Sequence, residues 1–371
     1  MVEPVRVLHI IQRMEAGGTQ ALLMNLYRNI DRSKVQFDFL VEYSDRQFYD
    51  DEIISLGGRI YYSTVREDYN LLMFKKQLRA LLKEHPEYKI IHVHAYTIGY
   101  ISLKTAKNEG VPIRIAHAHS NSIHHDKKRF LKKIMQKAFT VYATDLFACS
   151  EEAGKFHFKN KEFKVLQNAI DISHYLPNIE VREKLRKELN LGSKFVVGHV
   201  GRFQPEKNHQ FLLETFTALL KKKPNAMLLL LGDGPLRSQI ESQIQDNKAL
   251  CKNVLLLGNR PNVYNYLQIM DVFAFPSLYE GLGIVAIEAQ SAGIPILCST
   301  GVPEAGCITD LAQRLPLEAG PIKWAEKLLE ISLNPEAHKD HSTQICNAGF
   351  DINETSIMME KYYLNQYYSV L

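Results

Sequence analysis

Short apolar runs alternate with longer amphipathic segments along this chain of 371 residues. The apolar runs are typical of buried strands, and the segments between them place apolar residues at helical spacing. The first half predicts strands at 5–11, 36–41, 90–94, 114–119 and 145–148, and helices at 19–30, 70–85, 97–109 and 127–142. The second half predicts strands at 195–200, 227–231, 254–257, 272–275 and 294–298, again with helices between them. This alternation predicts an α/β protein with two doubly wound parallel sheets.

The periodic pattern stops between Asn168 and Asn178, a segment that contains Pro177. We therefore expect one domain at 1–175 and another at 176–354, which agrees with a chain longer than one hydrophobic core usually supports. Ligands of doubly wound sheets bind outside the carboxyl ends of the strands. Two such domains facing each other would form one cleft, and the loops that follow the strands would line it.

Composition describes an ordinary globular protein, with 46% hydrophobic and 23% charged residues. A formal net charge of +4 is weakly basic, which fits anionic substrates or membranes without requiring either. No apolar run approaches the ~20 residues that cross a bilayer, so we expect a cytoplasmic protein. Its cysteines are scattered and odd in number, which predicts a reducing compartment and no structural zinc. They are Cys149, Cys251, Cys298, Cys307 and Cys346.

Two glutamates flank a glycine-rich entry into a helix after the expected strand at 272–275. Glu280 lies in the expected loop, and Glu288 lies one to two turns into a helix that begins at Gly283. The amides of 283–285 would point at a ligand with the positive end of the helix dipole, which favours phosphate. One glutamate would hold a ribose diol and the other would face a sugar. The alternative is a surface helix with two solvated glutamates.

Two other loops carry groups suited to a diphosphate. Gly17 and Gly18 follow the first strand, where paired glycines let backbone amides approach a phosphate, and Thr19 is expected to cap the next helix. Arg202 and Lys207 follow the strand at 195–200, where two cations suit a diphosphate leaving group. Each loop also has an interpretation without a ligand. The glycine pair can be an ordinary turn, and the two cations can be solvated surface charges.

Histidines occupy two expected strand ends. His92 with His94, and His117 with His119, each place two imidazoles on one face of a strand. Such pairs can bind a metal, but no acidic or cysteine partner lies at ligand spacing, so no metal site is expected. No Asp-x-Asp sequence supplies a divalent-metal clamp either. We expect His119 to exchange a hydrogen bond with a sugar hydroxyl, and His92 and His117 to be packed structurally.

Taken in order, these pieces resemble a retaining glycosyltransferase of family 4 with the GT-B architecture, of the kind found in bacterial exopolysaccharide and capsule clusters. The resemblance covers nearly the full chain and rests on seven elements in register. They are Gly17-Gly18, Ala118-His119-Ser120, Phe147-Ala148-Cys149-Ser150-Glu151, Gln167-Asn168-Ala169-Ile170-Asp171, Gly201-Arg202 with Lys207, Gly232-Asp233-Gly234, and Pro276–Gly283 continuing to Glu288.

The resemblance implies roles for individual residues. Glu288 is similar to the glutamate that binds the ribose, Glu280 to one that contacts the donor sugar, and His119 to a histidine beside donor and acceptor. The implied diphosphate contacts are Gly17, Gly18, Arg202, Lys207, Leu282, Gly283, Ile284 and Val285. The segment 355–371 is similar to a final helix that completes the acceptor-side first domain. The loop ends in Gln20 where many members carry an acidic residue, which affects the expected first-domain contacts.

The implied activity is transfer of a sugar from a nucleoside diphosphate sugar, UDP-linked, to a hydroxyl of a growing, lipid-linked glycan, with retention and without a metal or other cofactor. No nucleic-acid partner is expected. Two other functions stay open: a nucleotide-sugar epimerase of the same architecture, and a noncatalytic nucleotide-sugar-binding subunit. Epimer formation without an acceptor would identify the first, and binding without turnover the second.

A basic amphipathic segment spans 127–139, with cations and apolar side chains separated at helical spacing. Such a helix can lie on an anionic leaflet, where each cation contributes ~1 kcal/mol. This would place the protein peripherally on the inner face of the cell membrane. The alternative is a helix whose apolar stripe faces the core and whose basic face is solvated.

Overall fold

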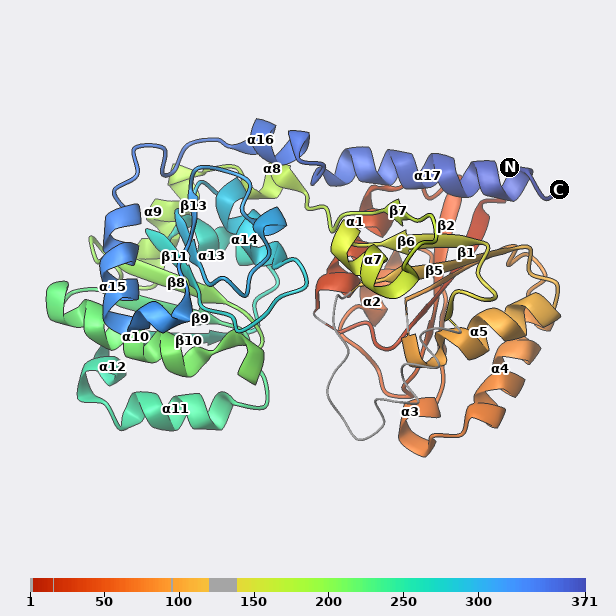
Figure 1. The fold of residues 1–371 in the computed structure, drawn as a ribbon, viewed down its shortest axis with the longest axis horizontal. Helices are drawn as coiled ribbons and strands as arrows, with labels where there is room; N and C mark the ends of the chain where they lie inside the picture. The colour runs from red at the N-terminus through yellow and green to blue at the C-terminus, as the bar shows by residue number, and fades with distance from the viewer. Residues whose placement is uncertain (1–2, 16, 95, 120–138) are drawn as a thin grey trace. The chain divides into compact units, whose positions relative to one another are not determined.

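The computed structural model describes residues 3–15, 17–94, 96–119 and 139–371 (Figure 1). The chain forms two compact units. The first unit comprises Met1–Ile170 and Gly349–Leu371, and the second comprises Asp171–Ala348. Within the described ranges, no helix combines the length and the apolar character that crossing a bilayer requires.

A seven-stranded parallel sheet forms the centre of the first unit, in the order β3-β2-β1-β4-β5-β6-β7. Its strands are β1 Val5–Ile11, β2 Val35–Val41, β3 Ile60–Tyr62, β4 Ile90–Val93, β5 Ile113–Ala118, β6 Asp145–Ala148 and β7 Lys164–Val165. Its helices are α1 Gly18–Asn29, α2 Asp50–Ser55, α3 Val65–Asp68, α4 Leu71–Glu84, α5 Tyr96–Asn108, α7 Glu151–Phe158 and α17 Ile352–Tyr368. The strand order reverses direction between β1 and β4, which is where ligands of such sheets bind.

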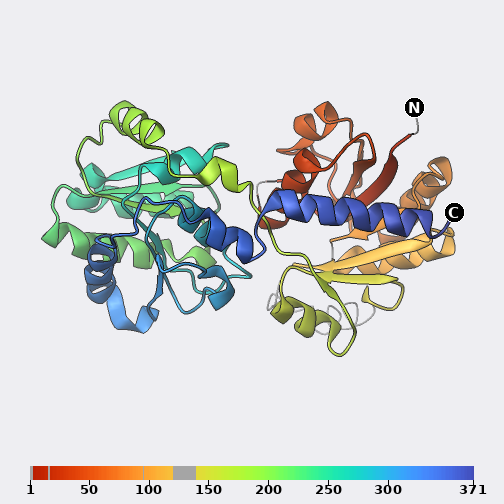
Figure 2. The same ribbon diagram turned by 90° about the horizontal axis from the view of Figure 1, so that it is seen from above.

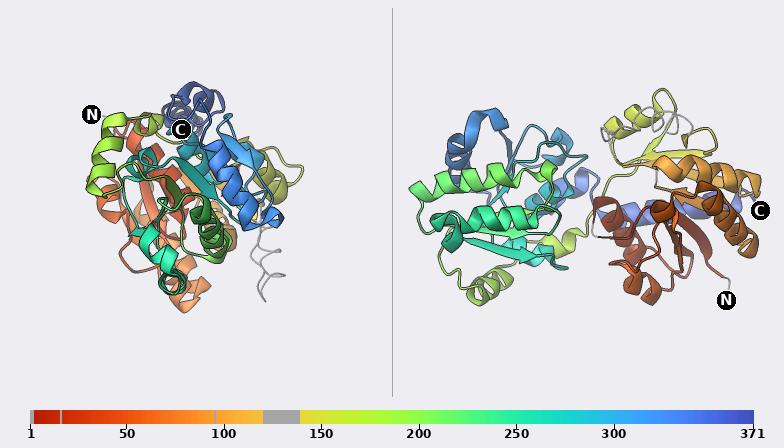
Figure 3. Two further views of the ribbon diagram at one scale, coloured as in Figure 1. Left: turned by 90° about the vertical axis from the view of Figure 1, so that its left-hand side faces the viewer. Right: turned by 90° about the horizontal axis from the view of Figure 1, so that it is seen from below.

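Helices cover both faces of this sheet. Leu22 and Leu26 of α1 share one buried cluster with Ile352, Met359 and Tyr363 of α17. The opposite face packs against α4 and α5. The helix α17, blue in the figures, runs with the red and orange elements of the first unit although it ends the chain (Figures 2 and 3). Each of its buried apolar side chains stabilises this face by about 1.5–3 kcal/mol.

A short backbone bridge ties the returning chain to the first unit. The amide of Ile170 donates to the carbonyl of Phe350 at 2.9 Å, and the amide of Ile352 donates to the carbonyl of Ile170 at 3.0 Å. Ile170 therefore pairs with Asp351 as an isolated parallel bridge. The two segments that leave and re-enter the first unit are held side by side at this point.

The second unit contains a six-stranded parallel sheet in the order β10-β9-β8-β11-β12-β13. Its strands are β8 Val196–Val200, β9 Met227–Leu231, β10 Val254–Gly258, β11 Val272–Phe275, β12 Ile296–Cys298 and β13 Ala312–Arg314. Its helices are α8 Ile172–Tyr175, α9 Ile179–Glu188, α10 His209–Lys222, α11 Arg237–Gln245, α12 Lys248–Asn253, α13 Val263–Gln268, α14 Ile284–Ser291, α15 Gly320–Ile331 and α16 Ser342–Asn347. Three 3₁₀ turns are η1 Pro205–Lys207, η2 Glu304–Gly306 and η3 Leu317–Ala319.

The predicted alternation of strands and helices is confirmed in both units. Three strands were not predicted: β3, β7 and β13, each of two or three residues. The helix predicted at 127–142 falls almost entirely on residues 120–138, which lie outside the described residues. All but the last residue of the predicted membrane segment 127–139 lies in the same range.

Candidate functional site

The candidate residues of the second unit follow the two strands at which its sheet changes direction. Arg202 and Lys207 follow β8, whereas Glu280 and Glu288 follow β11, the neighbour of β8 in the sheet. The carboxyl ends of adjacent parallel strands meet at one edge of the sheet, and ligands bind at such a switch point. The fold therefore brings two loops, far apart in sequence, to the position where a nucleotide site is expected.

Lys207 and Glu280 form an ion pair between these loops. The ammonium lies 2.5 Å from a carboxylate oxygen of Glu280, and the two side chains are only 15% and 13% exposed. The same ammonium lies 5.0 Å from the centre of the Phe275 ring. Because the pair is mostly shielded from water, its attraction is stronger than that of a surface pair. The sequence assigned the two residues to different parts of a ligand, and the structure places them in contact.

Three further hydrogen bonds hold the loop that carries Glu280. The amide of Leu278 donates to the carbonyl of Glu206 at 2.8 Å, and the amide of Glu280 donates to the carbonyl of Gly301 at 3.0 Å. The hydroxyl of Tyr279 donates to a carboxylate oxygen of Glu206 at 2.8 Å. Burial raises the pKa of Tyr279 to about 12, so this donor keeps its proton at neutral pH. The position of Glu280 is therefore fixed from both sides.

Gly283 forms the turn into α14, as the sequence predicts. It precedes the helix with φ of 75° and ψ of 54°, a left-handed conformation that side-chain-bearing residues rarely adopt. The amide of Ala286 donates to the carbonyl of Gly283 at 2.7 Å, which closes the first turn. The amides of Gly283, Ile284 and Val285 lie before the first hydrogen bond of the helix, so they have no acceptor within it. They form a helix N-terminus that can bind an anion.

We expect Gly283→Ala to cost more stability than an alanine at an open glycine. A Cβ at position 283 would lie 2.9 Å from Cε1 of Phe275, whereas Gly192, with φ of 53°, has no atom within 4 Å of its Cβ position. Gly192→Ala should cost about 1–2 kcal/mol from its backbone alone. Gly283→Ala should cost about 2–4 kcal/mol because crowding adds to the same strain. Urea unfolding measures the loss of stability in each variant. Equal losses for Gly283→Ala and Gly192→Ala would contradict the predicted crowding between the new Cβ and Phe275.

Glu288 lies within α14 and contacts the short helix α8. Its carboxylate accepts a hydrogen bond from the hydroxyl of Tyr175. Burial raises the pKa of Glu288 to about 7, and the Tyr175 hydrogen bond opposes part of that rise. Tyr175 keeps its proton because burial and the neighbouring Glu288 raise the pKa of its phenol. The structure therefore holds a carboxyl that changes its charge near neutral pH beside the proposed phosphate site.

Arg202 has a different environment from Lys207. Its side chain is exposed, and no ion pair among the described residues includes it. Hydrogen bonds fix the backbone on either side of Arg202. The amide of Gly201 donates to the carbonyl of Leu231 at 3.0 Å, and the amide of Phe203 donates to the carbonyl of Asp233 at 2.9 Å. A Cβ at Gly232 would lie 2.0 Å from the carbonyl oxygen of Gly201, so this loop requires glycine there. The backbone position of Arg202 is set, and its guanidinium projects from the loop.

In the first unit, Gly17 lies between β1 and α1 and Gly18 begins α1, and both are exposed. Gly17 has φ of −168° and occupies the N-cap position, where no side chain caps the helix. The prediction that Thr19 caps α1 is wrong, because α1 begins at Gly18 and Thr19 lies inside its first turn. The side chain of Gln20 folds back over the loop and donates to the carbonyl of Arg13 at 2.8 Å.

His119 follows β5 and belongs to a cluster of five histidines at the ends of β1, β4 and β5. The other members are His9, His92, His94 and His117. The cluster lies on the sheet face that α17 covers, where the hydroxyl of Tyr363 lies 2.7 Å from Nδ1 of His92. Burial lowers the pKa of every member, to about 3 for His9 and for His119. All five imidazoles are therefore neutral at pH 7.

Three features of the candidate site were not anticipated from the sequence. His9 lies in an apolar strand, where a lone histidine gives no signal of its partners. Tyr175 is 113 positions from Glu288, and no local pattern connects them. The Lys207–Glu280 pair spans 73 positions. Only adjacency of the two strands in a doubly wound sheet could have suggested that last contact.

Comparison with known proteins matches each unit to a glycosyltransferase family model. A family model described as Glycosyltransferase Family 4 matches residues 16–174, and one described as Glycosyl transferases group 1 matches residues 181–345. The chain is 36% identical over 338 residues to the putative glycosyltransferase EpsF of Bacillus subtilis (strain 168), covering 87% of this chain and 86% of that protein.

More distant proteins are similar to this chain over most of its length. The UDP-Gal:alpha-D-GlcNAc-diphosphoundecaprenol alpha-1,3-galactosyltransferase of Escherichia coli is 24% identical over 310 residues, covering 80% of this chain and 79% of that protein. The solved structure of Anabaena Alr3699/HepE in complex with UDP-glucose superposes with a TM-score of 0.76 at 18% identity, covering 97% of this chain and 99% of that one. The chain therefore belongs to the glycosyltransferases, with a family 4 domain in its first unit and a group 1 domain in its second, and it has the GT-B fold.

Proposed function

We propose that this glycosyltransferase moves a sugar from a UDP-sugar to a hydroxyl of a growing, lipid-linked exopolysaccharide or capsule glycan, with retention of anomeric configuration. The observation that carries the proposal is the set of groups at the switch point of the second sheet. A helix N-terminus, the Lys207–Glu280 pair and the titratable carboxyl of Glu288 all follow β8 and β11.

Each of these groups suits one part of a nucleotide sugar. The amides of 282–285 and the ammonium of Lys207 would bind the diphosphate and stabilise the charge that develops as it leaves. The ionised carboxylate of Glu288 would accept hydrogen bonds from the two ribose hydroxyls. Glu280 would accept from hydroxyls of the transferred sugar, and Arg202 would reach the diphosphate from its exposed position. Gly17, Gly18 and His119 would contact the ligand from the first unit.

Retention would follow if the sugar leaves and the acceptor attacks on the same face. The departing phosphate would then take the acceptor's proton, and no protein nucleophile would be needed. Neutralisation by Lys207, Arg202 and the helix N-terminus would replace a divalent metal. We therefore propose that transfer needs no cofactor.

The relatives support the choice of donor and acceptor. The E. coli relative is named for UDP-Gal and for an acceptor linked to diphosphoundecaprenol. HepE has been solved in complex with UDP-glucose. A further relative, CapH of Staphylococcus aureus, is named for capsular polysaccharide biosynthesis. A lipid-linked acceptor would also give the basic segment 127–139 a purpose, as a contact with the inner face of the cell membrane.

The test supplies a panel of UDP-sugars, an undecaprenyl-diphosphate-linked acceptor and a chelator, and follows the product by NMR. We expect one UDP-sugar to give a glycoside with the anomeric configuration of the donor, and the chelator to have no effect. An inverted product would contradict retention. Epimer formed without acceptor would identify an epimerase, and nucleotide binding without turnover would identify a noncatalytic subunit.

A further inference from the structure

The central strands of the second sheet part from each other directly beneath the candidate site. The strands β8 and β11 pair only at Val197 with Val272 and at Gly198 with Phe273. Beyond these residues β8 continues to pair with β9, and β11 continues to pair with β12, each for two more residues. The two central strands therefore separate after two residue pairs, at the carboxyl edge where Lys207 and Glu280 meet.

The side chain of His199 joins the two strands where their backbone pairing has ended. Its ring is fully buried, and Nδ1 lies 2.9 Å from the carbonyl oxygen of Ala274 on β11. A carbonyl oxygen can only accept a hydrogen bond, so Nδ1 must carry the proton. Burial, together with the nearby His209 and Lys207, lowers the pKa of His199, so the ring is neutral at pH 7. One backbone contact therefore sets the tautomer of this histidine.

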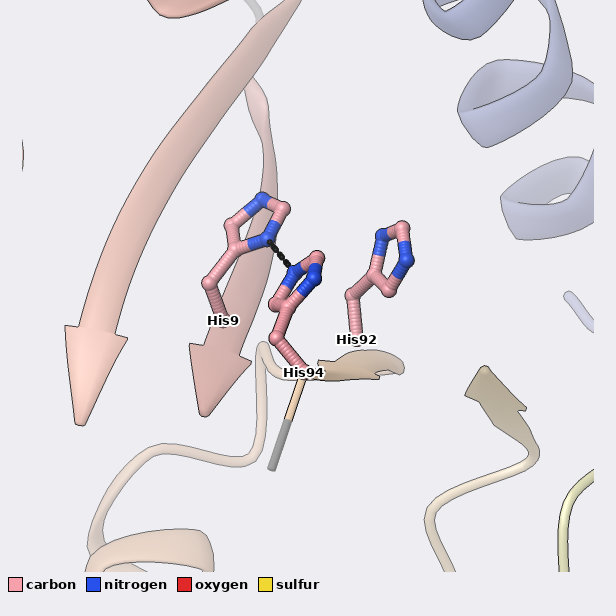
Figure 4. A group of neighbouring side chains, drawn as sticks. All are labelled: His9, His92 and His94. Carbon is pink, nitrogen blue, oxygen red and sulfur yellow. Dashed lines mark hydrogen bonds between the residues drawn. The ribbon is translucent and has the colours of Figure 1, made fainter. Parts of the chain in front are cut away.

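The buried histidines of the first unit differ in this respect. There, Nδ1 of His9 lies 3.0 Å from Nε2 of His94, and Figure 4 shows the two rings facing each other at neighbouring strand ends. Each neutral imidazole can act as donor or as acceptor, so a contact between two of them does not assign the proton. His199 instead contacts a group that has only one possible role.

The imidazole of His199 also lies beside the residues that surround Lys207. A Cβ at Gly201 would lie 3.2 Å from Nε2 of His199 and 3.2 Å from Cδ of Lys207, so both side chains border the α-carbon of Gly201. The ring centre of His199 lies 6.2 Å from that of Phe275, and the Lys207 ammonium lies over the Phe275 ring at 5.0 Å. The same ammonium lies 2.5 Å from Glu280. His199 is therefore next to both the loop after β8 and the end of β11.

We propose that His199 is a positioning residue whose hydrogen bond to Ala274 fixes the separation of the two strand ends and thereby holds Lys207 in place. The ammonium then stays over Phe275 and against Glu280. An apolar side chain at 199 would leave the Ala274 carbonyl buried without this donor, which is unfavourable, so the strand ends would shift. The effect on turnover rests on the proposed function, in which Lys207 acts on the departing diphosphate.

Two substitutions separate the hydrogen bond from the ring. His199→Phe keeps an aromatic ring beside Phe273 and removes the donor, whereas His199→Asn keeps a donor close to the position of Nδ1. Because a small displacement of a group that acts in the transition state lowers kcat, His199→Phe should lower kcat for sugar transfer by about tenfold, with KM for the donor within about twofold. His199→Asn should restore most of the loss. An unchanged kcat in His199→Phe, or an equal loss in His199→Asn, would overturn the proposal.

His341→Phe is the matched control for loss of a buried histidine. His341 lies in the segment before α16, and its Nε2 lies 3.1 Å from the carbonyl oxygen of Glu336. Its replacement should lower stability and leave kcat within about twofold of wild type. In a Lys207→Ala background, His199→Phe should lower kcat no further, because it acts through Lys207. A tenfold loss of kcat in the control, or losses that multiply in the double variant, would contradict a positioning role.

Two further measurements need no turnover, and the first uses the wild type alone. Long-range ¹H–¹⁵N NMR of the full chain labelled with ¹⁵N-histidine should show His199 protonated on Nδ1. In urea unfolding, Lys207→Ala should lower the midpoint less in the His199→Phe background than in the wild type, because its contact with Glu280 is already weakened there. A proton on Nε2 of His199, or equal shifts of the midpoint, would refute the inference. Absence of sugar transfer by the wild type would contradict the proposed function, and these two results would still decide whether His199 holds Lys207 in place.

Discussion

Lys207→Ala is expected to lower kcat/KM for sugar transfer by about 10²–10³, the usual effect of removing one group that stabilises developing charge. Two losses combine in this variant. On the proposed function the departing diphosphate would lose a cation, and Glu280 loses the partner that lies 2.5 Å away in a mostly buried position. A carboxylate left there without a cation is unfavourable, so its contact with a sugar should weaken too.

Lys222→Ala provides the matched control for this prediction. Lys222 lies at the end of α10 and pairs with Glu326 at 2.8 Å, where both side chains are exposed. Loss of such a surface pair changes stability by about 0–1 kcal/mol, so kcat/KM should stay within twofold of wild type. Steady-state kinetics with the UDP-sugar identified by the panel measure both variants. A Lys207→Ala enzyme within tenfold of wild type would show that the ammonium does not act on the leaving group.

Glu288→Gln should make the ligand-free protein more stable at pH 8 and leave its stability at pH 4.5 nearly unchanged. The pKa of Glu288 is raised from 4.5 to about 7, so the folded state keeps a proton that the unfolded state has already released. Stability therefore falls as pH rises through this window, and the full penalty is present above pH 7. Its size is about 1–3 kcal/mol. Thermal unfolding at the two pH values measures the difference.

The same substitution should weaken nucleotide binding by about 10–100-fold at pH 8, because hydrogen bonds to a charged acceptor contribute about 1.5–3 kcal/mol. Wild-type affinity for UDP should rise from pH 6 to pH 8 as Glu288 ionises. Glu214→Gln, an exposed glutamate on α10, should change neither stability nor binding. A flat pH profile of UDP affinity in calorimetry would refute the assignment of Glu288 to the ribose.

Apolar patterning predicted most of this fold because long buried strands have a strong signal. β1 and β9 are nearly continuous apolar runs, as expected for parallel strands covered on both faces. The pair Lys164–Val165 of β7 has no pattern at all, and its pairing with β6 is decided by tertiary contacts. The expected cap at Thr19 failed for a related reason. Capping depends on the backbone angles of Gly17, which the residue types alone do not determine.

Individual residues of the site were easier to predict than their partners. Gly283 adopts a left-handed conformation immediately before a helix, and this role depends only on its neighbours in the sequence. The sequence alone was therefore sufficient to predict the turn there. The ionisation of Glu288 depends on burial and on Tyr175, and His119 lies 2.8 Å from His94, which follows a different strand. These properties come from contacts between elements that are remote in sequence.

The return of the chain through α17 has a consequence for synthesis on the ribosome. Ile352, Met359 and Tyr363 are part of the core of the first unit, and they are translated after the whole second unit. The second unit, by contrast, is one continuous stretch from Asp171 to Ala348. Domains of a nascent chain usually fold in order from the N-terminus. In this protein the second unit can finish folding first, while one apolar face of the first unit stays uncovered until α17 has been translated.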